Sequence, residues 1–178
     1  MTKAQSDTPV PTKIFIHYLE CLEKLLNNLQ DHPNLLNERL APDMLNLLQQ
    51  ARTATGFTLR SCCPLAGRKI LSFSDNQTNL ASILAEVKTT RAYLRDIPEK
   101  EFENYSTRKI ETEAGFANLE FNGSDYFMMY TLPNFFFHYN MVFAILRKSN
   151  IAVGKADYDG FHQYPKGFSF VTADETAD

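Results

Sequence analysis

The residues best suited to chemistry in this sequence are an amide and a histidine that stand one helical turn apart. Asn134 and His138 lie in the stretch LPNFFFHYNMVFAILR, residues 132–147, and their spacing of four puts both side chains on one face of a helix. An imidazole can bind a metal, exchange a proton or form hydrogen bonds, but it can also be a satisfied core residue. Both interpretations of His138 are open at this point.

A metal site needs at least three convergent protein ligands, and the sequence offers little to complete one. His17 and Cys21 form a second pair four residues apart, at the edge of an apolar stripe. His32 falls in a turn and His162 near the carboxyl end, so neither has a helical scaffold. No His-x-x-x-His, His-Glu-x-x-His or Glu-x-x-His motif is present. We therefore expect no cofactor, and a divalent metal, if one binds, would use His138.

Two polar residues of an earlier segment extend the candidate site. Asp43 and Gln50 are seven residues apart, on the shoulder of the apolar stripe of a second expected helix. They form either a solvated helix edge or a polar wall that faces Asn134 and His138 across a pocket. The second interpretation gives a candidate ligand-binding set of Asp43, Gln50, Asn134 and His138.

Four amphipathic helices are expected to position these residues, because apolar side chains recur with a period near 3.6. Pro42 and Asp43 favour the start of the second helix, and Ser74 and Asp75 are good caps for the third. Pro133 predicts a kink or break in the fourth, because proline removes one backbone hydrogen bond. The expected helices cover residues 12–31, 42–63, 74–97 and 125–148.

A change of pattern between the third and fourth helices indicates a small hairpin. RKIETE and FANLEF read as short strands around Ala114 and Gly115. The predicted fold class is therefore all-α, a four-helix bundle with a small β-hairpin between helices 3 and 4. We expect a flexible tail over residues 1–11, the bundle over 12–160, and a strap with an acidic tail over 161–178.

The last helix carries apolar residues on two sides. One side, which we expect to face the core, holds Asn134, Phe137, His138, Met141, Val142 and Ile145. The other side holds Phe136, Asn140, Phe143 and Arg147. Aromatic residues and arginine are enriched at subunit contacts, so this second side predicts the interface of a homodimer. Alternatively, the carboxyl-terminal strap folds over Phe136 and Phe143.

Composition excludes several other classes of protein. A chain of 178 residues is long enough for one domain with a real core, and its formal net charge of -3 gives no reason to expect a nucleic-acid partner. The amino-terminal stretch lacks the apolar core of a signal peptide, and no apolar run approaches the roughly 20 residues of a membrane helix. The expectation is a cytoplasmic protein with free thiols and no membrane partner.

Three segments of the sequence resemble a known family. RLAPDMLNLLQQARTATGF, PLAG and LPNFFFHYNMVFAILRKSNIAVGKADYDG are similar to an uncharacterised bacterial domain of unknown function within the DinB/YfiT-like metalloenzyme superfamily. The resemblance covers residues 14–160, and the PN-aromatic-FH segment is its most specific part. It implies a DinB-like four-helix bundle, often dimeric, with a divalent metal held by three histidines.

The resemblance also implies where those histidines would stand, one on the second helix and two in a His-x-x-x-His on the fourth. His138 matches the last of them, Asn134 stands in place of its partner, and the helix-two position falls between Asn46 and Gln50, where no histidine occurs. Amides bind transition metals poorly, so the metal site is expected to be degenerate.

Three functions remain in competition at this stage. The leading hypothesis is a DinB-like protein that binds a small polar ligand in a pocket between helices. A metal-dependent hydrolase or thiol transferase that uses His138 is the enzymatic alternative. The third possibility is a dimeric structural or interaction protein, so the sequence leaves open whether the protein is an enzyme.

Overall fold

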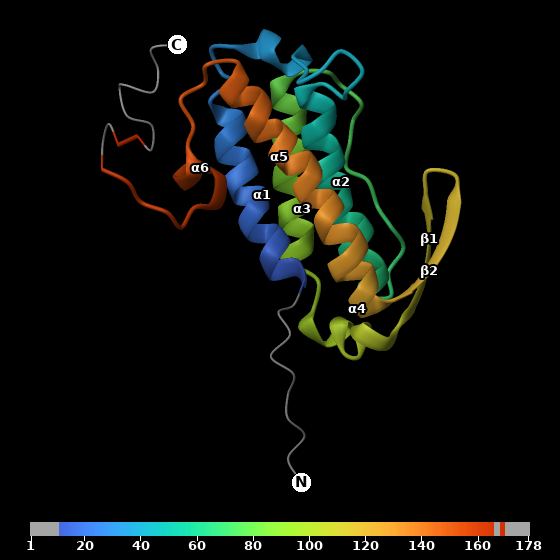
Figure 1. Ribbon diagram of the computed structural model, residues 1–178. Coiled ribbons are helices and arrows are strands. Elements are labelled where there is room, and N and C mark those ends of the chain that lie inside the picture. The colour runs from blue at the N-terminus through green and yellow to red at the C-terminus, as the bar shows by residue number, and fades with distance from the viewer. Residues whose placement is uncertain (1–10, 166–167, 170–178) are drawn as a thin grey trace.

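The computed structural model describes residues 11–165, 168 and 169, and it is mostly helical with one small hairpin (Figure 1). The long helices are α1 (Pro11–Asn27), α2 (Leu47–Leu65), α3 (Leu80–Arg95) and α5 (Leu132–Lys148). The predicted helical fold with a hairpin is confirmed, although the described residues form six α-helices rather than four. Apart from Pro11, the predicted amino-terminal tail lies outside the described residues, as does most of the acidic tail.

Short elements connect the long helices. The hairpin pairs β1 (Lys109–Ala114) with β2 (Ala117–Asn122) in antiparallel register, with Ile110 opposite Phe121. The remaining helical segments are 3-10 turns at Pro33–Asn37, Glu99–Phe102 and Tyr105–Thr107, α4 (Gly123–Asp125), a π-helical turn at Tyr126–Thr131, and α6 (Lys155–Asp159). Among the described helices, none is long and apolar enough to cross a membrane.

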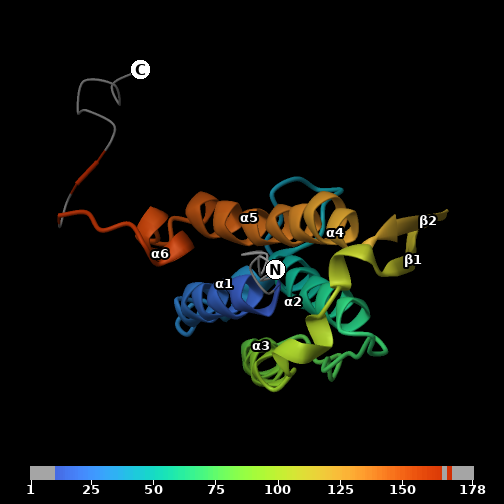
Figure 2. The ribbon, with the colours of Figure 1, turned by 90° about the horizontal axis from the view of Figure 1, so that it is seen from below.

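The long helices pack around one apolar core. Seen from below in Figure 2, α5 lies across α1 and α2, and α3 lies on the opposite side of that pair. Phe15 and Leu22 of α1, Leu59 of α2 and Ile83 of α3 are all buried. Each large apolar side chain that leaves water in this way contributes about 1.5–3 kcal/mol to stability. Burial of these stripes therefore fixes the helices that carry the candidate site.

Helix α2 begins later than the sequence predicted. Its amino-terminal cap is Asn46, whose side chain accepts from the backbone N–H of Gln49 at 2.8 Å, while the Gln49 side chain accepts from the N–H of Asn46 at 3.0 Å. This capping box satisfies two N–H groups that a helix start leaves without partners. The predicted start at Pro42 and Asp43 is wrong, because those residues lie in a turn outside the helix.

Helix α3 also begins later, and for the same physical reason. Asn79 accepts from the N–H of Ser82 at 2.9 Å and caps the helix at Leu80. Asp75 instead accepts from the N–H of Gln77 at 2.9 Å in a local turn. The predicted cap at Ser74 and Asp75 is wrong, since a better cap follows closer to the apolar stripe.

The irregularity expected at Pro133 takes the form of a wider helical turn. Pro133 stands in the first turn of α5, directly after the π-helical turn at Tyr126–Thr131. A proline has no N–H to donate, so it is accommodated best where the hydrogen-bond pattern already changes. Thr131 ends this turn, and its buried hydroxyl lies 2.7 Å from that of Ser61 on α2. This hydroxyl contact joins the π-helical turn to α2.

The core face of α5 differs from the predicted face. Its buried residues are Phe135, Tyr139, Val142, Ile145 and Leu146, whereas Phe137 is 51% exposed. The prediction that Phe137 faces the core is wrong, because the helix is rotated by about one residue, or about 100°, from the predicted orientation. The rotation turns Asn134 and His138 toward α2 and turns Phe136 and Phe143 toward α1 and α6.

Two glycines give a test of the backbone packing. A Cβ at Gly123 would stand 1.8 Å from the carbonyl oxygen of Tyr105, whereas a Cβ at Gly56, within α2, would meet nothing within 4 Å. We expect Gly123→Ala to lower the free energy of unfolding by about 1–3 kcal/mol, because two backbone segments must separate. Gly56→Ala should raise it by about 0.5–1 kcal/mol through helix propensity. Urea unfolding measures both, and equal effects would contradict the packing.

Candidate functional site

The candidate site is a direct contact between α2 and α5. The Nδ1–H of His138 donates to the Oε1 of Gln50 at 2.7 Å, and the two residues are 88 positions apart in the chain. Gln50 is only 1% exposed, and His138 is half-buried. Of the four residues predicted to bind a ligand, the structure joins these two by a hydrogen bond. We call this contact the Gln50–His138 pair.

The hydrogen bonds of Gln50 determine which nitrogen of His138 carries the hydrogen. The Nε2 of Gln50 donates to the carbonyl oxygen of Leu45 at 3.3 Å, so its Oε1 is the atom that faces the imidazole. An amide oxygen only accepts, so Nδ1 of His138 must be the protonated nitrogen. In the neutral ring, Nε2 is then an acceptor, and it has no hydrogen-bond partner among the described residues. Nor is it among the buried polar atoms that lack one.

The surroundings of the imidazole favour its neutral form. The ring of Phe57 stacks on His138 with centroids 5.7 Å apart and planes 20° apart. Burial lowers the pKa of His138 from its ordinary value of 6.5, and the positive charge of Arg60 lowers it further. At neutral pH the ring therefore offers a lone pair at Nε2 rather than a second donor.

Asn134 lies one turn before His138 on α5, as predicted, but its amide is already engaged. Its Nδ2 donates to the carbonyl oxygen of Tyr130 at 2.7 Å, in the turn just before it. Tyr130 packs edge-on against Phe57, with centroids 6.2 Å apart. The Nδ2 of Asn134 is thus bonded to the backbone, and no hydrogen bond joins the side chains of Asn134 and His138 within the described residues.

Asp43 does not take part in this arrangement. It lies exposed in the turn before α2, because the helix begins only at Leu47. The loop closes on itself through the N–H of Leu47, which donates to the carbonyl oxygen of Glu38 at 2.8 Å. Without a helical position, Asp43 loses the seven-residue register with Gln50 on which the predicted polar wall depended.

The donor set around His138 does not fit a transition metal. Nowhere in the part of the chain that the structure describes do three histidine, cysteine, aspartate or glutamate side chains gather as they would around a metal ion. Gln50 lies within the helix-two window of the superfamily histidine and supplies an amide oxygen, a weak transition-metal ligand. Its oxygen is moreover taken by the Nδ1–H of His138.

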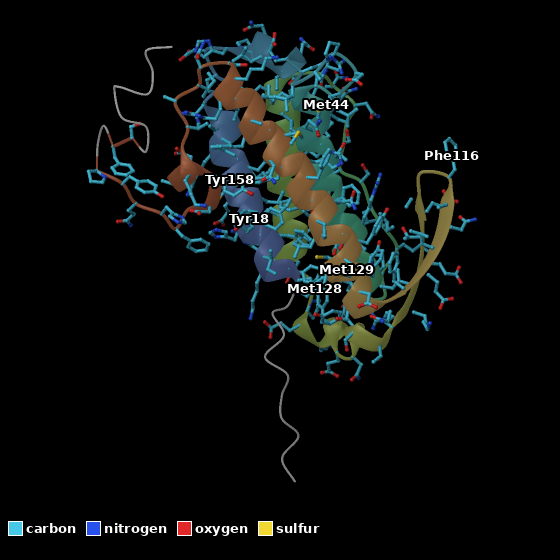
Figure 3. The ribbon with its side chains drawn as sticks, in the orientation of Figure 1. Tyr18, Met44, Phe116, Met128, Met129 and Tyr158 are labelled. Carbon is cyan, nitrogen blue, oxygen red and sulfur yellow. The ribbon has the colours of Figure 1, made fainter. Side chains whose placement is uncertain are left out.

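The residues predicted to form a dimer interface have partners within the chain. The ring of Tyr18 lies edge-on to Phe136 at 4.8 Å, and that of Tyr158 lies edge-on to Phe143 at 5.4 Å. Figure 3 shows Tyr18 of α1 and Tyr158 of α6 beside each other.

Polar residues of the same side also bond within the chain. The hydroxyl of Tyr158 donates to Asn140 at 2.6 Å, and Arg147 donates to the carbonyl oxygen of Val153 at 2.9 Å. The segment after α5 thus covers Phe143 and Asn140 through Tyr158, whereas Phe136 lies against α1. A contact with a second copy stays a prediction.

Two hollows of the surface lie away from the Gln50–His138 pair. One, of about 750 Å³, lies between the hairpin and Ile70, and the other, of about 250 Å³, is lined by the turn at residues 37–42 and Lys148. The larger hollow is lined by Glu111, Glu113 and Glu120 and has no histidine or cysteine. We place the candidate site at the Gln50–His138 pair because a half-buried imidazole there meets the side chain of a buried amide from another helix.

Phe57 and Arg60 complete the surroundings of His138, and the sequence analysis did not identify them. Phe57 stands seven residues after Gln50, which is two helical turns along the same face. The guanidinium carbon of Arg60 lies 5.2 Å from the centre of the Phe57 ring. The seven-residue spacing from Gln50 is the signal in the sequence that could have identified Phe57.

The family known as DUF1993, described as a domain of unknown function, matches residues 9–159. A crystal structure of a DinB family member protein from Shewanella denitrificans is similar, with a TM-score of 0.77 and 26% sequence identity. The similarity covers 86% of this chain and 92% of that chain. A comparison with curated proteins found no match.

The lowered pKa of His138 gives a prediction for stability. The unfolded chain protonates His138 near pH 6.5, but the folded chain protonates it only at lower pH. The free energy of unfolding should therefore fall as the pH drops from about 6.5 toward the folded pKa, with no contribution above about 6.5. His138→Gln removes this pH-dependent contribution to the free energy of unfolding and leaves the other histidines in place. Urea unfolding from about pH 7.5 to about pH 5 should show wild type losing more stability than the variant. Parallel curves would place the ring in full contact with water.

Proposed function

The chain belongs to the DUF1993 family of domains of unknown function, and from this premise we propose that it binds a small polar molecule at the Gln50–His138 pair. In this proposal α1, α2, α3 and α5 are the four helices of a DinB-like bundle. The ligand lies on α2 and α5 and donates an O–H or N–H to Nε2 of His138. The likeness to the DinB family member protein supports the fold, and the residues of the Gln50–His138 pair support the kind of ligand.

One observation carries the proposal, namely that Gln50 holds His138 in a single tautomer whose Nε2 has no hydrogen-bond partner among the described residues. A buried amide that bonds both to Leu45 and to the ring leaves the imidazole little freedom to rotate. A group held in its binding orientation pays less entropy when the ligand arrives. The stacked Phe57 ring adds an apolar surface for the ligand carbon atoms.

The metal-dependent alternative is supported less well by the same residues. A hydrolase or thiol transferase of that kind needs open coordination positions on a firmly held ion. His138 supplies one imidazole, whereas Gln50 and Asn134 have amides that are bonded to protein groups. We therefore assign His138 the role of a hydrogen-bond acceptor, and no catalytic role.

Neutral probes test the binding role directly. Ethylene glycol offers O–H groups and acetamide offers N–H groups, and we expect both to shift the ring nitrogen resonances of His138 in a saturable way in 15N spectra. His138→Asn should abolish the saturable shifts, because the acceptor is removed. The matched control is His162→Asn, which alters a histidine of the carboxyl-terminal segment and should leave binding unchanged. Probes that saturate elsewhere while the His138 resonances stay fixed would contradict the proposal.

Metal content separates the proposal from its alternative. Protein purified without chelator should carry zinc, nickel, iron and manganese well below one ion per chain, and their addition should not raise the melting temperature. The reason is that the pair provides a single imidazole. Near-stoichiometric metal that disappears in His138→Ala would overturn the assignment of His138 as an acceptor.

A further inference from the structure

Arg60 differs from the other arginines in having no ion-pair or hydrogen-bond partner for its side chain among the described residues. Its side chain is exposed on α2, and no carboxylate or carbonyl of the described residues bonds to its guanidinium. Every other arginine donates to a carboxylate or a backbone carbonyl, namely Arg39, Arg52, Arg68, Arg91, Arg95, Arg108 and Arg147. Arg60 is thus a cation whose hydrogen-bond donors remain available for an external group.

Arg60 stands next to the Gln50–His138 pair. Its guanidinium carbon lies 5.2 Å from the centre of the Phe57 ring, and the imidazole of His138 stacks on the same ring at 5.7 Å. The positive charge also contributes to the lowered pKa of His138, as expected for a nearby cation. The Phe57 ring therefore contacts both the guanidinium of Arg60 and the imidazole of His138.

The backbone at Arg60 is held in place by a contact with the π-helical turn. The hydroxyl of Tyr126, which is 1% exposed, donates to the carbonyl oxygen of Arg60 at 2.9 Å. Next to it, the hydroxyl groups of Ser61 and Thr131 meet at 2.7 Å inside the protein. The π-helical turn thus fixes the position from which the arginine side chain extends, while the guanidinium itself stays in solvent.

We propose that Arg60 and His138 together bind a small oxyanion that also carries an O–H group, such as a hydroxy carboxylate or a phosphate. The guanidinium donates to the anionic oxygens, and Nε2 of His138 accepts the hydroxyl hydrogen. The inference rests on the proposed binding role of His138 and adds the charge of the ligand. Guanidinium groups suit planar carboxylates and phosphates, because two N–H groups can donate in parallel.

A matched set of small probes separates the two contributions. Glycolate has the carboxylate and the hydroxyl, acetate has the carboxylate only, and ethylene glycol has hydroxyls only. We expect glycolate to bind at least about tenfold more tightly than either of the others, since it alone uses both partners. Inorganic phosphate, which keeps an O–H at neutral pH, tests whether phosphoryl groups are taken as well. Ring nitrogen shifts of His138 at constant ionic strength report each affinity.

Charge variants then assign the anion to Arg60. Arg60→Gln should weaken glycolate binding about tenfold and leave ethylene glycol unaffected, because only the charged contact is lost. The control is Lys88→Gln, which removes a positive charge from an exposed position on α3 and should change neither affinity. Both sites are exposed, so the variants are expected to keep the fold, and thermal unfolding checks this.

Three results would overturn the inference. Glycolate binding that survives Arg60→Gln but is lost in His138→Asn removes Arg60 and leaves the proposed function intact. Equal affinities for glycolate and ethylene glycol would also remove Arg60 from the site and leave the proposed function intact. If no probe shifts the His138 resonances in the wild type, the oxyanion site is refuted, and the proposed function fails with it.

Discussion

Burial of Phe135 and Tyr139 fixes the rotation of α5 about its own axis, and that rotation decides what each remaining side chain of the helix can reach. Tyr139 is fully buried, so its hydroxyl needs an acceptor inside the protein, and it donates to the carbonyl oxygen of Tyr158 at 2.6 Å. This bond holds α6 over one flank of α5. The other flank then faces α2, where His138 meets Gln50. The covering segment and the candidate site therefore depend on the same buried stripe.

The helices could be predicted from the sequence because their buried residues recur with the helical period. The starts of α2 and α3 could not be predicted in this way. The observed α1, α2, α3 and α5 each fall almost wholly within a predicted range. At the start of α2 two signals compete, a proline with an acidic residue at Pro42 and a capping box at Asn46. The first only favours the opening turn, but the second satisfies two backbone N–H groups, so it determines the start. Asp43 was lost from the site for this reason alone.

The face that α5 presents to the core could not be predicted from the sequence, for a different reason. Phe135, Phe136 and Phe137 are consecutive and equally apolar, so the pattern of hydrophobic residues does not choose among three rotations. The choice is made by a tertiary contact, the ring of Phe15 against Phe135 at 5.1 Å. Gln50 and His138 were still identified, because both lie beside the core stripe and remain on neighbouring flanks after the rotation.

The amides of the site change what the remaining histidine can do. In the superfamily that the chain resembles, three imidazoles would direct their lone pairs at one ion. Here the Gln50 oxygen accepts from Nδ1 of His138, and the Asn134 amide donates to the carbonyl oxygen of Tyr130 in the turn before α5. The lone pair at Nε2 of His138 is therefore left without a partner among the described residues. A single acceptor selects for hydrogen-bond donors rather than for metals. The fold can tolerate that change, because its stability depends on the stripe of Phe135 and Tyr139 and not on the ligands.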